Sequence, residues 1–321
     1  MTSNDVGTMA AEDKDDYYTK TDADAEFLTS NKLDVETDAE DSADLVLTDA
    51  NDNVLVQFAD GHIKTKEFDS RNVPESIISW DFLDLSGKTV GFLGDSITAG
   101  AGASSNSKRY STLFCDYAGC TERNMGIIGT CLCNNTKNGA SANRFLNRVT
   151  SSNINGLDLL VIFGGTNDFS YDSKAVGNHF EEETITGNTY VGTKKRIPNS
   201  DNETFSGALH ELILAVRTIN QGLPIVYITP LNRRNYNSGD PRPATQECNA
   251  NGDYITDYVD AIKDICQFYS IPVFESTNHY PYDYSQTGFT TYSTDGIHPN
   301  DTGHAVLAKA LYRWIVTNLT I

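Results

Sequence analysis

The chain has 321 residues, enough for one large α/β domain with an appendage or for two ordinary domains. Its 44 aspartates and glutamates outnumber its 24 lysines and arginines, giving a formal net charge of −20 at pH 7, and the first 50 residues hold 15 of the acids but only 3 of the bases. Nucleic acids and anionic membrane surfaces attract positively charged proteins, so we expect neither as a partner.

The apolar runs and the cysteines further restrict the class of protein. No apolar run is long enough to span a membrane, and no basic start followed by an apolar run opens the chain, so we expect a soluble protein without a recognisable secretion signal. The spacing of the cysteines does not match zinc knuckles, so no metal site is predicted. Buried or incidental thiols are favoured, and disulfides stay open for an exported protein. The six cysteines are Cys115, Cys120, Cys131, Cys133, Cys248 and Cys266.

The first 44 residues are polar and acidic, with few large apolar side chains. On its own this segment is expected to be extended or disordered, because it has too little apolar surface to offset the entropy of ordering. Tyr17-Tyr-Thr-Lys followed by Phe27-Leu-Thr resembles the loosely repeated pattern of stalks in phage tail proteins and related surface fibres. This resemblance implies packing against copies of itself, which leaves open a homo-oligomer such as a trimer and a virion or cell surface as the setting.

Short alternating runs then predict a small β-meander at about 45–68. Three runs, at 45–48, 53–58 and 62–66, are separated by polar residues and by Asp60-Gly61, and Asp-Gly between alternating runs is a strong hairpin signal. So few strands are marginally stable alone and must dock on something else. With the linker at 71–74 they form a second segment, 45–75, which leaves 76–321 for the main domain.

Beyond Lys88, strand-like and helix-like patterns alternate. Buried parallel strands are predicted at 89–93, 157–163, 224–229 and 271–274, where apolar residues rich in β-formers cluster. Helical spacing of apolar residues predicts helices over 205–219, 258–268 and 307–315. This alternation implies a parallel sheet covered on both faces, with ligands at the carboxyl ends of its strands.

Long loops follow the strand ends, at 169–202, 231–252 and 275–296, and loops of that length are usually functional or mobile. The third loop is rich in aromatic residues that could stack on a sugar ring or line an acyl groove, although simple loop packing explains them equally well. Two histidines in these loops could also touch a substrate. The candidate substrate-binding residues are Tyr280, Tyr282, Tyr284, Tyr292, His179 and His279.

The turn after the first predicted strand presents a serine. The apolar run at 90–93 ends at Gly94 and places Ser96 in a turn, with helix-compatible residues after it. The hydroxyl would lie at the carboxyl edge of the sheet, near amides able to stabilise negative charge. The alternative is that Ser96 only caps a helix.

Four blocks fall at this edge. They are Gly94-Asp-Ser96-Ile-Thr98, Asn124-Met-Gly-Ile-Ile-Gly129 after the expected second strand, Gly164-Gly-Thr-Asn167-Asp168, and Asp295-Gly-Ile-His298-Pro299 before the last helix. Their types and order, over roughly residues 86–318, resemble the SGNH, or GDSL, hydrolase family. The resemblance implies an α/β fold, a three-layer α/β/α sandwich with a parallel, flavodoxin-like sheet, here with a small β-rich N-terminal appendage. It also implies a serine esterase that needs no cofactor or metal.

The family roles carry over one position at a time. Ser96 matches the nucleophile, and its own amide joins the oxyanion hole. Gly129 matches the glycine whose N–H is the second donor, and Asn167 the asparagine whose side-chain amide is the third. His298 matches the general base and Asp295 the carboxylate that orients it.

The chemistry needs these residue types independently of any family. A serine hydroxyl is a weak nucleophile near neutral pH and needs a base to take its proton. Histidine suits that role, and a carboxylate on its other ring nitrogen fixes the tautomer and stabilises the imidazolium. Asp295 and His298 lie within one short turn that Pro299 stiffens. Fixed N–H donors are needed for the oxyanion that develops on the attacked carbonyl.

Rival residues exist for some roles. Gly126 competes with Gly129 as the second donor, because both are glycines of the same block. Asp95 and Asp168 flank catalytic positions and are expected to hold their loops by accepting backbone N–H bonds.

Among the other histidines, His62 lies in the predicted hairpin and His210 in a predicted helix, so both are poorly placed for this edge. His304 opens the last helix, where we expect a surface or capping residue rather than the base.

We therefore predict hydrolysis of carboxylic esters through an acyl-enzyme. Polar loops, tyrosines and the absence of a long apolar lid favour a small acyl group, such as acetyl, on a carbohydrate. The alternative is a lipase or acylhydrolase acting on longer acyl chains. A second hypothesis, from another class, is a tail or surface-fibre component that uses this domain to bind or trim glycans.

Overall fold

The structure is a computed structural model that describes residues 85–134, 144–170, 174–185, 194–233, 248–280, 291–293 and 295–319, together with the backbone of four strands between residues 33 and 64. The chain divides into two compact units, Met1–Asp81 and Phe82–Ile321. The boundaries predicted at 44 and 75 stay predictions. The stalk-like motifs at Tyr17 and Phe27 and the linker at 71–74 lie outside the described residues.

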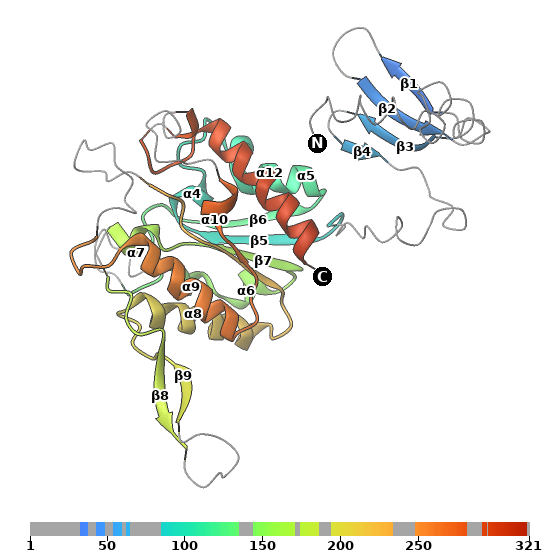
Figure 1. The fold of residues 1–321 in the computed structure, drawn as a ribbon. Helices are drawn as coiled ribbons and strands as arrows, with labels where there is room; N and C mark the ends of the chain where they lie inside the picture. Colours follow the sequence, from blue (N-terminus) through green and yellow to red (C-terminus); the bar gives the residue numbers. More distant parts are fainter. Residues whose placement is uncertain are drawn as a thin grey trace, which may run out of the picture. The chain divides into compact units, whose positions relative to one another are not determined.

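The first unit contains a four-stranded antiparallel sheet in the order β1-β2-β3-β4 (Figure 1). Its strands are β1 (Leu33–Thr37), β2 (Ala43–Thr48), β3 (Val54–Ala59) and β4 (His62–Lys64). The last three coincide with the alternating runs of the predicted meander. β1 pairs with β2 and lies inside the segment that was expected to be extended or disordered on its own.

The second unit is built on a five-stranded parallel sheet (Figure 1). Its strands are β5 (Thr89–Gly94), β6 (Thr121–Gly126), β7 (Leu159–Phe163), β10 (Ile225–Ile228) and β11 (Val273–Phe274). The spatial order β11-β10-β7-β5-β6 is the flavodoxin-like order, in which the strand order reverses beside the first strand of the sheet. The predicted fold class is therefore confirmed.

Helices cover both faces of this sheet (Figure 1). The three long ones, α8 (Phe205–Ile219), α9 (Ile255–Phe268) and α12 (Asp301–Asn318), confirm the three predicted helices. The shorter ones are α4 (Ser96–Ala99), α5 (Tyr110–Ala118), α6 (Ser151–Ile154), α7 (Thr166–Ser170) and α10 (Ser276–His279), with 3₁₀ turns η2 (Asn106–Lys108) and η4 (Phe145–Arg148). None of the helices in the described ranges is long and apolar enough to cross a membrane.

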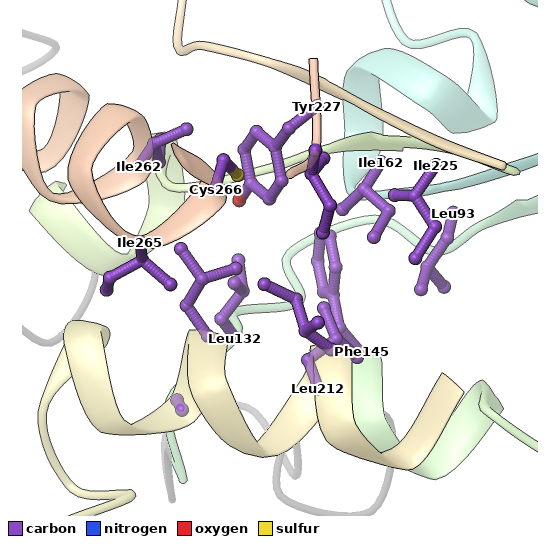
Figure 2. Packing of buried hydrophobic residues seen from close by; sticks show 14 of the residues in the cluster. Leu93, Leu132, Phe145, Ile162, Leu212, Ile225, Tyr227, Ile262, Ile265 and Cys266 are labelled. Atoms are coloured by element: carbon purple, nitrogen blue, oxygen red, sulfur yellow. The ribbon is translucent and has the colours of Figure 1, made fainter. Parts of the chain in front are cut away.

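Alternate residues of the strands form two separate cores. In β7, Leu160 and Ile162 face α8 and α9, whereas Leu159 and Val161 face α5 and α12, because successive side chains of a strand point to opposite faces. Figure 2 shows the first core, where strand residues meet side chains of α8 and α9: Leu93, Ile162, Ile225, Tyr227, Leu212, Ile262, Ile265 and Cys266. Burial on both faces holds the strand ends, and the loops that follow them, at one edge.

Two elements differ from the sequence-based expectation. The second block does not follow its strand, because β6 runs to Gly126 and contains the first half of the block. The loop at 169–202 contains an antiparallel ribbon, β8 (Phe180–Thr184) and β9 (Lys194–Pro198), in which Glu182 and Glu183 lie opposite Arg196 and Lys195. Both strands are mostly charged and so lack the apolar alternation by which a strand is recognised.

Candidate active site

The turn after β5 presents Ser96 as the first residue of the short helix α4. The N-cap of this helix is Asp95, whose Oδ1 accepts the N–H of Ile97 at 2.9 Å, so Ser96 is not the capping residue. The helix ends after one turn at Gly100, whose φ of 96° is a conformation that glycine adopts easily. Ser96 is only 4% exposed, held between the sheet edge and the loops around it.

The hydroxyl of Ser96 meets the imidazole of His298, which lies 202 positions away in the chain. Ser96 Oγ and His298 Nε2 are 2.8 Å apart. His298 Nδ1 lies 2.6 Å from Asp295 Oδ2. A neutral imidazole with its proton on Nδ1 satisfies both contacts, because Nδ1–H then donates to the carboxylate and Nε2 accepts from the serine hydroxyl.

Backbone amides fix the carboxylate of Asp295 from the other side. Its Oδ1 accepts the N–H groups of Ile297 at 2.8 Å and of His298 at 2.7 Å. Burial acts to raise the pKa of Asp295, but the hydrogen bonds from the side chain and backbone of His298 and from Ile297 outweigh it and hold that pKa below its ordinary value. The carboxylate is therefore ionised at neutral pH.

Ser293 stabilises the turn that carries these two residues, and sequence reasoning missed it. Its Oγ accepts the N–H of Gly296 at 2.8 Å and donates to the carbonyl of His298 at 2.7 Å. Serines that bond nearby backbone in this way are common in turns. The only signal in the sequence is a serine shortly before Asp295, which is too general to identify the role.

Asn167 follows β7 closely in the chain and reaches across to the loop after β6. It lies in α7 and is 6% exposed. Its Nδ2 donates to the carbonyl of Thr130 at 2.9 Å, which uses one of its two amide hydrogens. The contact ties the two loops together.

The two glycines of the second block have different surroundings. The N–H of Gly126 donates to Asn124 Oδ1 at 2.9 Å, and a Cβ at this position would lie 2.3 Å from the backbone nitrogen of Ala99. Gly126 thus allows close approach of β6 to α4. Gly129 has φ +73°, and a Cβ on this residue would meet no atom within 4 Å, so its turn has open space beside it.

An arginine that no sequence motif singled out joins three parts of the site. Arg148 of η4 is 7% exposed, and its Nη1 donates to the carbonyls of Gly94, at 2.6 Å, and of Met125. Its Nη2 donates to Thr130 Oγ1 at 3.0 Å. Burial lowers the pKa of Arg148 to about 10, so it still carries its charge at neutral pH. One guanidinium thereby connects the end of β5, the end of β6 and the loop that Asn167 also contacts.

Asp95 and Asp168 hold backbone, as expected. Asp95 caps α4, and Asp168 accepts the N–H groups of Cys133 at 2.9 Å and of Leu132 at 3.2 Å. Burial raises the pKa of Asp95 to about 6, and burial also raises the pKa of Asp168. Neither side chain is close enough to His298 to form a hydrogen bond among the described contacts.

His304 is not the surface or capping residue that we expected. It is fully buried, its Nδ1 accepts the N–H of Tyr110 at 3.2 Å, and its Nε2 contacts the carbonyl of Ala101 at 3.2 Å. The N-cap of α12 is Asn300. Burial lowers the pKa of His304 to about 4, so the ring is neutral and engaged through both nitrogens.

The two loop histidines and His210 lie among structural contacts. His210 Nε2 contacts the carbonyl of His179 at 2.7 Å, and His179 Nδ1 lies 2.9 Å from a carboxylate oxygen of Asp264 on α9. His279 stacks on the ring of Phe274, with centroids 4.8 Å apart. Substrate contacts of His179 and His279 stay predictions.

The aromatic loop is described only in part. Tyr280 is 5% exposed and packs beside Tyr292, with ring centroids 6.2 Å apart. Tyr282 and Tyr284 lie outside the described residues. The substrate-binding role of these four tyrosines stays a prediction. Within the described ranges, no group of three or more histidines, cysteines, aspartates or glutamates could hold a metal ion.

Comparison with known proteins gives a family and a fold. Residues 92–306 match the model of the GDSL-like lipase/acylhydrolase family, a range that includes Ser96, Asn167 and His298. No curated protein matches the chain.

Solved structures resemble a large part of the chain. One crystal structure is 24% identical, covers 74% of this chain and 100% of its own, and superposes with a TM-score of 0.61. A protein from Lactobacillus plantarum is 23% identical; the match covers 73% of this chain and 99% of that protein, with a TM-score of 0.57. A carbohydrate acetylesterase family member from Sinorhizobium meliloti is 15% identical; the match covers 72% of this chain and 100% of that protein, with a TM-score of 0.48. The first two support the fold described above.

Proposed function

The chain belongs to the GDSL-like lipase/acylhydrolase family, and from that premise we propose that it is a serine esterase that cleaves carboxylic esters through an acyl-enzyme. The observation that carries the proposal is the unbroken contact chain from Ser96 Oγ through His298 to Asp295, at 2.8 and 2.6 Å. A hydroxyl, an imidazole and an ionised carboxylate in this order are the parts that nucleophilic acyl transfer requires.

In the proposed first step, Ser96 attacks the ester carbonyl while His298 Nε2 takes the hydroxyl proton. The imidazolium that forms is stabilised by Asp295, which also keeps Nε2 free of a proton beforehand. His298 then gives the proton to the departing alcohol, leaving an acyl group on Ser96. Water, deprotonated by the same imidazole, attacks the acyl-enzyme and releases the acid.

We propose that three N–H donors stabilise the tetrahedral oxyanion: the backbone amides of Ser96 and Gly129 and the side-chain amide of Asn167. Gly126 fits less well, because its N–H is already bonded to Asn124. Asn167 keeps a second amide hydrogen after its bond to Thr130. Donors fixed in advance need no reorganisation when the charge develops, which is why each contributes about 3–4 kcal/mol in comparable sites.

For the substrate we propose a short acyl group, acetyl in the first place, on a carbohydrate. The support comes from the sequence, whose loops at this edge are polar and rich in tyrosine and include no long apolar segment to cover a fatty acyl chain. A longer-chain ester is the alternative.

A panel of esters tests both the proposed nucleophile and the proposed acyl group. p-Nitrophenyl acetate and octanoate, together with acetylated sugars, are assayed with the wild type, with Ser96→Ala and with Ser105→Ala, an exposed serine of the following loop. We expect Ser96→Ala to abolish turnover with an unchanged circular dichroism spectrum, and Ser105→Ala to behave as wild type. Full turnover by Ser96→Ala would refute the nucleophile, whereas a clear preference for octanoate would refute only the acetyl assignment.

A further inference from the structure

Two thiols meet at the end of α5, beside the start of the edge strand β6 and outside the candidate active site. Cys115 lies in the last two turns of α5 and Cys120 directly precedes β6. Both are free thiols, and their Sγ atoms are 2.7 Å apart. Only a small displacement separates them from a covalent S–S bond, whose length is about 2.05 Å.

The backbone, rather than the thiols, creates this proximity. α5 ends at Gly119, which has φ 66°, and the N–H of Cys120 donates to the carbonyl of Cys115 at 3.1 Å. This is the hydrogen bond of a Schellman motif, in which the residue after the left-handed glycine packs against the residue five positions before it. The helix cap therefore delivers the two side chains to each other in the folded chain.

We propose that Cys115 and Cys120 are a modification site, a dithiol that closes to a disulfide by exchange with a disulfide oxidant such as oxidised glutathione or a thiol–disulfide oxidoreductase. Cys120 is the thiol that reacts first, because it is half-buried whereas Cys115 is buried. The hydrogen bond with Cys120, together with burial, also raises the pKa of Cys115, which keeps that thiol protonated in the reduced pair.

The exchange balances in two steps. The thiolate of Cys120 attacks one sulfur of the oxidant, breaks its S–S bond and releases the first small thiol. Cys115 then loses its proton to solvent and attacks the sulfur of Cys120, which forms the intramolecular disulfide and releases the second thiol. The protein loses two hydrogen atoms, and one oxidant disulfide becomes two thiols.

The disulfide would affect stability rather than turnover. It joins the C-terminal end of α5 to the amino end of β6, whereas Ser96 and His298 lie at the carboxyl end of the strands. Closing this short loop constrains the unfolded chain, although less than a long loop would. We expect a higher melting temperature and an unchanged kcat in the oxidised form. The inference is independent of the proposed esterase activity.

The sequence provides a sharp assay, because trypsin releases both cysteines in one peptide, residues 110–123. The intact protein is equilibrated in glutathione buffers of increasing oxidised fraction, alkylated in denaturant and digested. We expect peptide 110–123 to become lighter by two hydrogen atoms and to resist alkylation until it is reduced. Peptide 124–137, which holds Cys131 and Cys133, shows whether the buffer oxidises buried thiols in general.

Two variants complete the test. Cys120→Ser should lose the rise in melting temperature on oxidation, and Cys248→Ser, which removes an exposed thiol, should keep it. Alkylation of both thiols in strongly oxidising buffer would overturn the proposal. So would a glutathione adduct on Cys120 that persists beside a free Cys115, or closure of peptide 124–137 at the same oxidised fraction.

Discussion

Replacing Arg148 by methionine should slow turnover although none of its described hydrogen bonds goes to Ser96. Methionine retains much of the apolar volume but donates no hydrogen bonds. The variant removes one donor from each of three oxygens: the carbonyls of Gly94 and Met125 and the hydroxyl of Thr130. We infer that Arg148 is a positioning residue for the proposed oxyanion hole, because the carbonyl of Thr130 is also the acceptor of Asn167.

The contacts set the size of the effect. Hydrogen bonds to charged groups contribute about 1.5–3 kcal/mol each. Gly94 keeps a second donor, the N–H of Ile127 at 3.2 Å, which limits the loss at that carbonyl. We expect the free energy of unfolding to fall by about 3 kcal/mol. If Thr130 moves by about 1 Å, misalignment of the donors near it should lower kcat roughly 100-fold, with KM changed much less.

The assay is steady-state hydrolysis of p-nitrophenyl acetate well below the melting temperature of each variant, with circular dichroism to confirm folding. Arg123→Met is the matched control, because Arg123 also donates to two carbonyls, of Asn153 at 3.1 Å and Asn155 at 2.7 Å, and none of its described hydrogen bonds goes to the loops of the site. Its kcat should stay within about twofold of wild type, since the interactions made in the transition state are intact. A wild-type kcat in Arg148→Met, with only the stability lowered, would refute the positioning role.

Asp295→Asn should lower kcat by about 10²–10⁴ with little change in KM, because the amide neither fixes the His298 tautomer nor stabilises the charged imidazolium. Single-turnover kinetics would show whether acylation is the slowed step. Asn167→Ala should lower kcat by about 10²–10³, and a loss confined to KM would contradict an oxyanion role. The pKa of His304 falls from 6.5 in a free side chain to about 4, so its contribution to stability is present above pH 6.5 and is lost as the pH falls toward 4, by about 3 kcal/mol in total. Urea unfolding between pH 4 and 7 should therefore show a shallower acid loss for His304→Gln than for wild type, and parallel curves would contradict it.

The sheet and its helices could be predicted because their patterns come from burial. β7 is buried on both faces, so its sequence is a continuous apolar run, and α8 carries one apolar stripe. The parallel arrangement then places the strand ends at one edge, and the resemblance of the four blocks to the family paired Ser96 with His298 there. The structure brings the two together at 2.8 Å.

The residues that sequence reasoning missed act through contacts that have no periodicity. Arg148 lies in a 3₁₀ turn between the second and third strands of the sheet, and a single arginine there looks like a surface residue. β8 was missed because four of its five residues are polar, so that its pairing with the basic strand β9 rests on cross-strand charge rather than on a buried face. The position of His304 suggested a surface or capping residue, but α12 packs on α5 and the ring lies buried against Tyr110 and Ala101.

The pKa values of two buried groups beside the site are shifted in opposite directions, so their contributions to the pH dependence of stability partly cancel. The pKa of Asp95 rises from 3.8 to about 6, so its neutral form is favoured in the fold, and its contribution to stability is present below pH 3.8 and lost as the pH rises through 6. His304 behaves in reverse, losing its contribution as the pH falls from 6.5 to about 4. Between about pH 4 and 6, the folded protein holds a proton on Asp95 that the unfolded chain has lost, and lacks a proton on His304 that the unfolded chain binds. The two differences have opposite effects, so the stability of the wild type should vary less with pH than either group alone would cause. Burial raises the pKa of Asp95, while the hydrogen bond from the N–H of Ile97 and the charge of Arg148 act in the opposite direction.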